Sequence, residues 1–424
     1  CWGAQDNGRL GNALTAVANV LRPTTAQKVA GSHIWRNIWS GAVSSCGVKT
    51  DGVGYCWGLG ANHSVCRSDG TTTDQGTPTA VDVTNLAEDS MLSVVPTYNS
   101  TNGGGVMILT SEGKLFGCGS RTSDNGYLGV NTAGTVTALA DPTAVVLTNV
   151  SEVSWRVFPG SYHNTANCAV TVEGEGHCWG LNSHGQLGDN TITTRHLPVD
   201  LVMTNVTAPQ KFLTIQNGNQ NTCAITLDGK MYCNGRHLYG NVGTGAAAQD
   251  TDPYELLTPV DVSVLNDAAG YPYVRPKFIQ VATGATHSCG VTSKGEAWCW
   301  GSDANGQLGT AVGNDNSQYP VKVSSSEYFI QVVVGTTHSC GLNGQGVAYC
   351  WGSDAAGQLG AGATDHSSHV PVAVSQAGLT GDDVFRSLAA GGSTTSSNAT
   401  VVEVRNVTRG SRVTVSGVVC YRLT

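Results

Sequence analysis

The chain has 424 residues, of which 55 are glycine and only 12% are charged, and its formal net charge is −8. This acidic balance disfavours DNA, RNA or an anionic membrane as the main partner, because each would require a basic face. No apolar run approaches the roughly 18 residues of a membrane-spanning helix. Abundant Gly, Thr, Ser and Val are typical of a turn-rich, all-β protein. The sequence starts at Cys1 without Met or a signal peptide, so we expect a mature or trimmed chain whose targeting segment has been lost.

Two kinds of element alternate along the chain, and each occurs seven times. The first is an apolar strand followed by a small or polar run, and in chain order its copies end at Cys46, Ile108, Cys168, Cys223, Cys289, Cys340 and Ser396. The second is a "CWG"-type segment, which starts at Cys1, Cys56, Cys118, Cys178, Cys233, Cys299 and Cys350. Units of three or four short strands cannot bury both faces alone, so the repeats predict a closed ring of sheets.

Ten of the 14 cysteines form five pairs that are ten residues apart: Cys46/Cys56, Cys168/Cys178, Cys223/Cys233, Cys289/Cys299 and Cys340/Cys350. A glycine follows the first cysteine of each pair by six residues, as in "HSCGVTSKGEAWCWG", which predicts a β-hairpin with a tight turn. The two cysteines then face each other across the strands and can form a disulfide. Repeated disulfides indicate an oxidising compartment, so we expect an extracellular protein, secreted or at the cell surface.

The ends of the chain are half-repeats. Residues 1–11 resemble the second half of a repeat, and residues 385–399 resemble the first half of one. We therefore expect 1–11 and 385–424 to complete one blade together, which would remove the free edges of the ring. The resulting prediction is an all-β, seven-bladed β-propeller that forms a single domain over residues 1–424.

Four cysteines remain outside the ten-spaced pairs. Cys66 lies in a polar loop and Cys118 has lost its hairpin partner, so a bond between them across neighbouring blades is expected. Cys1 and Cys420 are left over at the two ends, where closure would bring them together. The alternative is that one of these cysteines bonds another molecule.

The segments "WCWGSDANGQLG", "YCWGSDAAGQLG" and "HCWGLNSHGQLG", with the "VxxGxxHSC" strand before them, resemble the repeat of the regulator of chromosome condensation family. The resemblance implies a seven-bladed propeller in which Trp57, Trp179, Trp300 and Trp351 wedge between blades. The best-known activity of that family is nucleotide exchange on a nuclear GTPase with docking through a basic tail, and it is not expected here because the chain is acidic. Secreted members of the fold bind proteins.

Catalytic and metal-binding motifs are absent from the sequence: there is no Walker loop, H-E-x-x-H, G-x-S-x-G or Rossmann fingerprint. His287 and His338 recur at one repeat position, which favours framework hydrogen bonds over metal binding. "SDANG" at Asp303 and "SDNG" at Asp124 resemble the start of a calcium loop but lack the Glu that an EF-hand requires. We interpret both as Asx turns, and we expect no enzyme activity, cofactor or metal.

Six N-glycosylation sequons occur, a count that composition alone would produce, at Asn62, Asn99, Asn149, Asn205, Asn398 and Asn406. Asn149 and Asn205 occupy the same place in successive repeats, on a connection between blades. If the source is eukaryotic, these two are the best glycan candidates.

The functional hypothesis is a non-enzymatic extracellular propeller that associates with itself as the building unit of an assembly or fibre. The last strands carry Arg405, Arg409, Arg412 and Arg422 on an acidic body, which suits contacts between subunits. The alternative is a secreted protein inhibitor or a glycan-binding, lectin-like module, whose partner is another extracellular protein or a glycan. A third hypothesis is an enzyme that uses the central funnel, such as a lyase or hydrolase.

Overall fold

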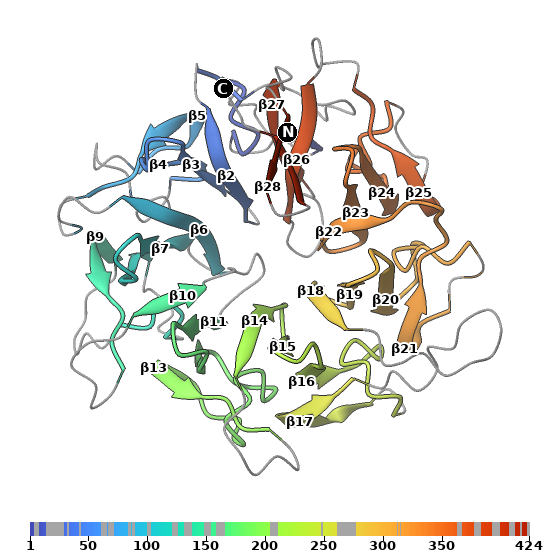
Figure 1. Ribbon diagram of the computed structural model, residues 1–424. Helices are drawn as coiled ribbons and strands as arrows, with labels where there is room; N and C mark the ends of the chain where they lie inside the picture. Colours follow the sequence, from blue (N-terminus) through green and yellow to red (C-terminus); the bar gives the residue numbers. More distant parts are fainter. Residues whose placement is uncertain are drawn as a thin grey trace.

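The computed structural model describes the residues 1–3, 8–13, 29–31, 34–41, 44–60, 66, 72–83, 86, 90–99, 103–120, 126–130, 138–147, 154–157, 166–203, 211–246, 249–260, 277–311, 313, 315–362, 367–376, 383–391, 399–406, 412–415 and 418–421. Within these ranges every regular element is a β-strand. The strands are arranged as a ring of small antiparallel sheets around a central axis (Figure 1). We call the cavity between the innermost strands the channel.

Six blades have four strands each, and within each blade the strands follow one another in chain order from the channel outward (Figure 1). Blade 1 contains β2 (Trp35–Ser40), β3 (Ser44–Lys49), β4 (Gly54–Gly58) and β5 (Gln75–Ala80). Blade 2 contains β6 (Met91–Asn99), β7 (Gly103–Thr110), β8 (Leu115–Ser120) and β9 (Ala138–Ala144). Blade 3 contains β10 (Trp155–Val157), β11 (Ala166–Thr171), β12 (Gly176–Gly180) and β13 (Arg195–Asp200).

The second half of the ring repeats this plan. Blade 4 contains β14 (Phe212–Asn217), β15 (Asn221–Thr226), β16 (Met231–His237) and β17 (Gln249–Pro259). Blade 5 contains β18 (Phe278–Thr283), β19 (His287–Thr292), β20 (Ala297–Gly301) and β21 (Ser317–Lys322). Blade 6 contains β22 (Phe329–Val334), β23 (His338–Asn343), β24 (Ala348–Gly352) and β25 (Ser368–Ala373).

The remaining sector holds a smaller sheet built from both ends of the chain. It has the order β1–β27–β26, from β1 (Trp2–Gly3), β26 (Asp383–Gly391) and β27 (Ala399–Asn406). Trp2 lies opposite Thr400 and Gly3 opposite Ala399. The last strands, β28 (Arg412–Val415) and β29 (Val418–Tyr421), form a separate two-stranded hairpin.

The prediction of seven blades is therefore wrong: the structure has six four-stranded blades. The count of repeated elements treated the first and last segments as two halves of a full blade. In the described part of the chain those segments supply only three strands to their common sheet, and the other C-terminal strands pair with each other instead.

The ten-spaced cysteines form hairpins because a glycine makes each turn. Cys46 pairs directly with Cys56 across β3 and β4, and Gly52 in the turn between them has a φ of 84°. A side chain with a Cβ adopts that left-handed conformation only at a cost, so glycine is suited to the position. The equivalent turn glycine in blade 6, Gly346, has a φ of 81°.

The core consists of layers between neighbouring blades. One layer joins blade 5 to blade 6 and includes Val291, Val332 and Trp351, all fully buried. The tryptophans that were expected to wedge between blades, Trp57, Trp179, Trp300 and Trp351, are all 0% exposed. Their burial holds the blades in a fixed arrangement around the channel.

Candidate functional site

Each of the four wedge tryptophans also makes a hydrogen bond to the segment that precedes its own blade. The indole N–H groups donate to single backbone carbonyls, in the pairs Trp57 to Arg9 (2.9 Å), Trp179 to Tyr127 (3.0 Å), Trp300 to Asn241 (2.9 Å) and Trp351 to Gln307 (2.9 Å). The same carbonyls accept a second bond from the later blade, donated by Ser45, Asn167, Ser288 and Ser339. These contacts are structural, and they leave the channel and the outer faces for function.

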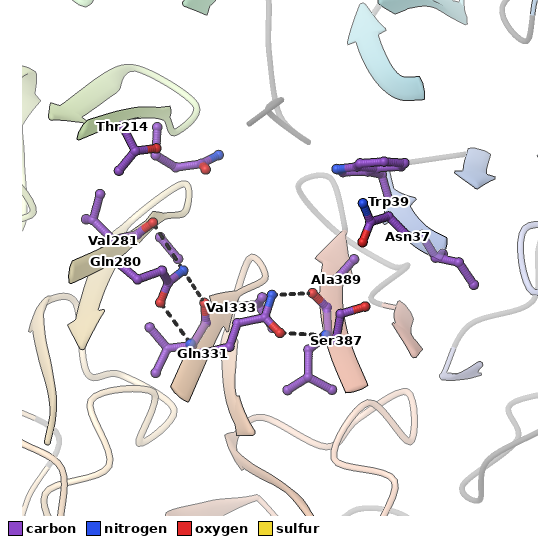
Figure 2. Close-up of a pocket in the computed structure, with 14 residues that line it drawn as sticks. Asn37, Trp39, Thr214, Gln280, Val281, Gln331, Val333, Ser387 and Ala389 are labelled. Atoms are coloured by element: carbon purple, nitrogen blue, oxygen red, sulfur yellow. Dashed lines mark hydrogen bonds between the residues drawn. The ribbon is translucent and has the colours of Figure 1, made fainter. Parts of the chain in front are cut away.

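The channel is lined by the innermost strands. A cavity of about 310 Å³ lies between β2, β14, β18, β22 and β26. Its lining includes the Trp39 ring and the polar side chains of Asn37, Thr214, Gln280 and Gln331 (Figure 2). None of its 14 described lining residues is ionisable.

Two glutamines of the channel wall join neighbouring blades through their side-chain amides (Figure 2). Gln280 donates from Nε2 to the carbonyl of Val332 (2.8 Å) and accepts at Oε1 from the N–H of Val332 (2.9 Å). Gln331 makes the same pair of bonds with Leu388, at 2.9 and 2.7 Å. Each glutamine side chain thus bonds to the next innermost strand as a backbone residue of a paired strand would.

One rim of the propeller, which we call the turn face, is formed by the hairpin turns and by the starts of the innermost strands. The two features lie together because a turn glycine accepts a bond from the first residue of the next innermost strand, as in Phe278 to Gly229 (3.1 Å) and Phe329 to Gly295 (2.7 Å). Large apolar side chains are exposed on the turn face, namely Ile34, Val53, Val172, Leu227, Ile279, Tyr328 and Ile330.

Charges accompany the apolar side chains on the turn face. The residue before the turn glycine is acidic in four turns, at Asp51, Glu112, Glu173 and Asp228. Some of these carboxylates pair with lysines of the same face, such as Asp51 with Lys49 at 2.7 Å. That lysine helps to lower the pKa of Asp51 by its hydrogen bond. Lys211 and Lys277 also lie against turn glycines, so the turn face combines apolar side chains with charges of both signs.

Four histidines are buried in the described part of the chain, namely His177, His237, His287 and His338. His287 approaches Ser339 of the next blade at 2.8 Å through Nε2, and His338 is likewise fully buried. The repeat position predicted to carry framework hydrogen bonds does so at His287. His177 contacts Asp200 at 2.9 Å through Nδ1, and burial lowers the pKa of this imidazole below 6.5 more than Asp200 and Glu175 raise it.

Of the two segments that resemble the start of a calcium loop, the one at Asp303 forms a turn. Asp303 accepts from the backbone N–H of Leu308 at 2.8 Å, and burial raises the pKa of its carboxyl. Asp124 lies outside the described residues. Across the described ranges, no three His, Cys, Asp or Glu side chains are placed to hold a metal ion. No helix within them is long and apolar enough to cross a membrane.

Six disulfides lie among the described residues. Five join the ten-spaced cysteines across hairpins, with Cα–Cα distances of 4.0–4.1 Å. The sixth joins Cys66 to Cys118 of β8, which links blade 1 to blade 2. Cys1 is buried, whereas the side chain of Cys420 lies outside the described part, so that pairing stays a prediction.

All six sequon side chains likewise lie outside the described part of the chain. Asn99 and Asn406 end strands whose backbone is described, but their side chains are not. Asn62, Asn149, Asn205 and Asn398 fall between the described ranges. Their glycosylation stays a prediction.

The channel glutamines and the turn face were not identified from the sequence. The signal for the glutamines was the repeated "FIQV" at 278–281 and 329–332. Other repeats carry Asn37, Thr214 or Ser387 at the same position, so the pattern was visible only in two copies. The exposed apolar residues lie in turns and at strand starts. In the sequence they look like the buried apolar residues of the neighbouring strands.

Comparison with known proteins shows which repeat type the chain contains. The model of the regulator of chromosome condensation (RCC1) repeat matches residues 173–225, 294–342 and 345–396, and a second RCC1 repeat model matches 278–307 and 329–358. The ultraviolet-B receptor UVR8 of Arabidopsis thaliana is 25% identical over 74% of this chain. The human E3 ubiquitin-protein ligase HERC2 is 29% identical over 61% of it. The chain spans 63% of UVR8 and 5% of HERC2.

Solved structures agree on the fold. Human WBSCR16 superposes with a TM-score of 0.76 at 16% identity, over 96% of this chain and 99% of that one. Prp20p from Saccharomyces cerevisiae, which was studied for its binding to Gsp1p and histones, superposes with a TM-score of 0.74 at 17% identity, over 96% and 91%. The chain thus contains RCC1-type repeats, and it shares the propeller fold of these solved structures.

Proposed function

We propose that the protein is a non-enzymatic, extracellular interaction propeller that associates with further copies of itself through its turn face. RCC1-like propellers form a protein-interaction fold, and the relatives named above include proteins that bind other proteins. The fold alone does not select a partner, so the proposal depends on the surface of this chain.

The observation that carries the proposal is the set of apolar side chains exposed on the turn face. Tyr328 is 69% exposed, Ile330 57% and Ile279 47%, and all three lie at the starts of β18 and β22. Aromatic and aliphatic side chains of this kind form the buried centres of protein interfaces. Covering them removes apolar area from water, which favours association.

Pairing of individual charges is compatible with a second copy as the partner. The turn face carries Asp51, Glu112, Glu173 and Asp228 beside its lysines, and the C-terminal segment carries Arg405, Arg409, Arg412 and Arg422, which can pair with such carboxylates. Contact between the turn face of one copy and the C-terminal segment of the next would join two different surfaces. A contact of that type builds open filaments unless the rotation between copies closes a ring.

The six disulfides support a location outside the cell, because reducing cytosol rarely maintains such bonds. The same bonds would protect the blades of a building unit that has to persist in an extracellular assembly. The prediction of a single domain over 1–424 is retained as part of this proposal.

Light scattering of the native protein at about 0.05 and 0.5 M salt tests the proposal. We expect multimers at low salt and partial dissociation at high salt, since exposed charges are screened. Ile279→Ser with Ile330→Ser should weaken association about tenfold or more. Ile192→Ser, which changes an exposed residue outside the turn face, serves as the matched control. A strictly monomeric particle at both salt concentrations would contradict self-association and favour the inhibitor or lectin alternative.

A further inference from the structure

The innermost strands have one edge that their own blade does not use. In an antiparallel pair, successive residues alternate between bonding the partner strand and pointing away from it. The bond from Gly284 N–H to the His287 carbonyl (2.8 Å) sets this alternation in blade 5 and leaves Val281 pointing away from β19. The bond from Gly41 to Ser44 (2.8 Å) leaves Ile38 pointing away from β3 in the same way.

Gln280 and Gln331 show which chemical group fits such an edge. Each offers a primary carboxamide whose N–H and C=O point in the same direction, and each satisfies both polar groups of one backbone residue. A trans secondary amide cannot do so, because its N–H and C=O point in opposite directions. A carboxylate cannot do so either, because it has no N–H to donate.

The equivalent positions in two other junctions carry short side chains. Thr214 stands where a glutamine would reach Val281, and Ser387 stands where one would reach Ile38. Neither makes a bidentate pair of this kind in the described part of the chain. All four residues line the 310 Å³ cavity. The Val281 carbonyl already accepts a bond of 3.3 Å from Nε2 of Gln280, so Ile38 offers the more open of the two edges. Edge groups that lack partners bind complementary groups readily.

We propose that the channel binds a small, neutral, planar molecule bearing a primary carboxamide or a lactam. It pairs with Ile38 as the glutamines pair with Val332 and Leu388, or with Val281 once Nε2 of Gln280 is displaced from that carbonyl. The cavity volume lies at the lower end of the range for small-molecule pockets, about 300–1,000 Å³. The lining favours a neutral ligand, since none of its described residues is ionisable. The Trp39 ring reaches from β2 toward the open space and offers a surface for a planar group (Figure 2). This site is separate from the turn face.

Benzamide is the probe that tests the inference, with N-methylbenzamide and benzoate as matched controls. The native protein is titrated with each compound while the backbone amide NMR signals of Ile38 and Val281 are followed. We expect benzamide to shift at least one of these signals in a saturable manner. The two controls should bind at least about tenfold more weakly, because they lack the N–H beside the C=O. Equal binding of all three compounds, or no shift up to about 10 mM benzamide, would overturn the inference.

Filling the gaps supplies the second test. Thr214→Gln and Ser387→Gln together should place two new amides on Val281 and Ile38 and abolish benzamide binding. The melting temperature should stay equal or rise, since two junctions gain the bonds already present at Gln280 and Gln331. Thr193→Gln, at an exposed position outside the channel, should leave binding unchanged. Undiminished binding in a folded double variant would refute the site. Oligomeric state is measured separately, so the two proposals can fail independently.

Discussion

At the scale of residues, equivalent positions in different blades make the same kind of contact with a buried carbonyl of the preceding blade, but with different side chains. In blade 6, Trp351 and Ser339 both donate to the Gln307 carbonyl. In blade 4 the tryptophan position holds Asn234, which donates to the neighbouring carbonyl of Gly185 at 2.6 Å instead. The buried acceptor is satisfied in both cases, as buried polar groups generally are.

The environment of His177 predicts a pH dependence of stability. The ring is buried against Trp155 at 5.6 Å in an edge-on contact, and burial lowers its pKa below 6.5. As pH falls, the unfolded chain binds this proton before the native state does, so the native state loses stability below about pH 6.5. The unfolding free energy of the wild type relative to His177→Gln should therefore decline from about pH 8 to pH 5. Urea unfolding across that range measures the difference, and a pH-independent difference would refute the role of His177.

At the scale of elements, the hairpins stabilise the blades by two different loop closures. The bond between Cys340 and Cys350 closes a loop with a sequence separation of 10, whereas that between Cys66 and Cys118 has a separation of 52. In the chain-entropy view, the longer loop restricts the unfolded state more. The sixth disulfide also joins two blades, so its loss would affect the packing between them.

Removal of single disulfides should reflect these loop lengths. We expect Cys340→Ala with Cys350→Ala to cost about 3 kcal/mol of unfolding free energy, and Cys66→Ala with Cys118→Ala to cost about 4 kcal/mol. Chemical unfolding of both double variants gives the comparison. The prediction is wrong if the hairpin variant is the less stable of the two. Non-reducing peptide mapping of the wild type should find Cys289 joined to Cys299.

Sequence spacing was sufficient to predict the hairpins but not the channel wall. Two cysteines ten apart with a glycine at the turn allow one register, as Cys289 opposite Cys299 shows. The bidentate glutamines depend on the distance between neighbouring blades, which no local pattern encodes. Gln280 is separated from Val332 by 52 residues, and only the tertiary arrangement brings them together.

At the scale of the whole molecule, the sequence predicted a ring but not the number of its full blades. Counting repeats could not show that the terminal segments form a three-stranded sheet, β1–β27–β26. β28 pairs with β29, which lies close to it in the sequence, and not with a strand from a distant part of the chain. A nearby partner has the lower entropic cost of loop closure.

Deleting residues 1–11 should destabilise the ring and promote aggregation. The deletion exposes the edge of β27 that pairs with Trp2 and Gly3, and unpaired edges associate with other chains. It also removes the Arg9 carbonyl that accepts from Trp57 and Ser45. Light scattering and melting temperature measure the effect, and a synthetic peptide of residues 1–13 added in trans should partly reverse it. A truncated protein that remains equally stable and unaggregated would count against closure by this segment.

The four tryptophan hydrogen bonds between blades all run in one direction along the chain, and this has a consequence for biosynthesis. The acceptor carbonyls of Arg9, Tyr127, Asn241 and Gln307 precede their tryptophan donors by 44 to 59 residues. A chain that emerges from the ribosome amino end first therefore presents each docking point before the blade that needs it. When the blade of each of these tryptophans folds, the carbonyl that accepts from its indole N–H has therefore already been synthesised. The propeller is suited to vectorial assembly, one blade after another, with the pairing of β1 and β27 as the last event.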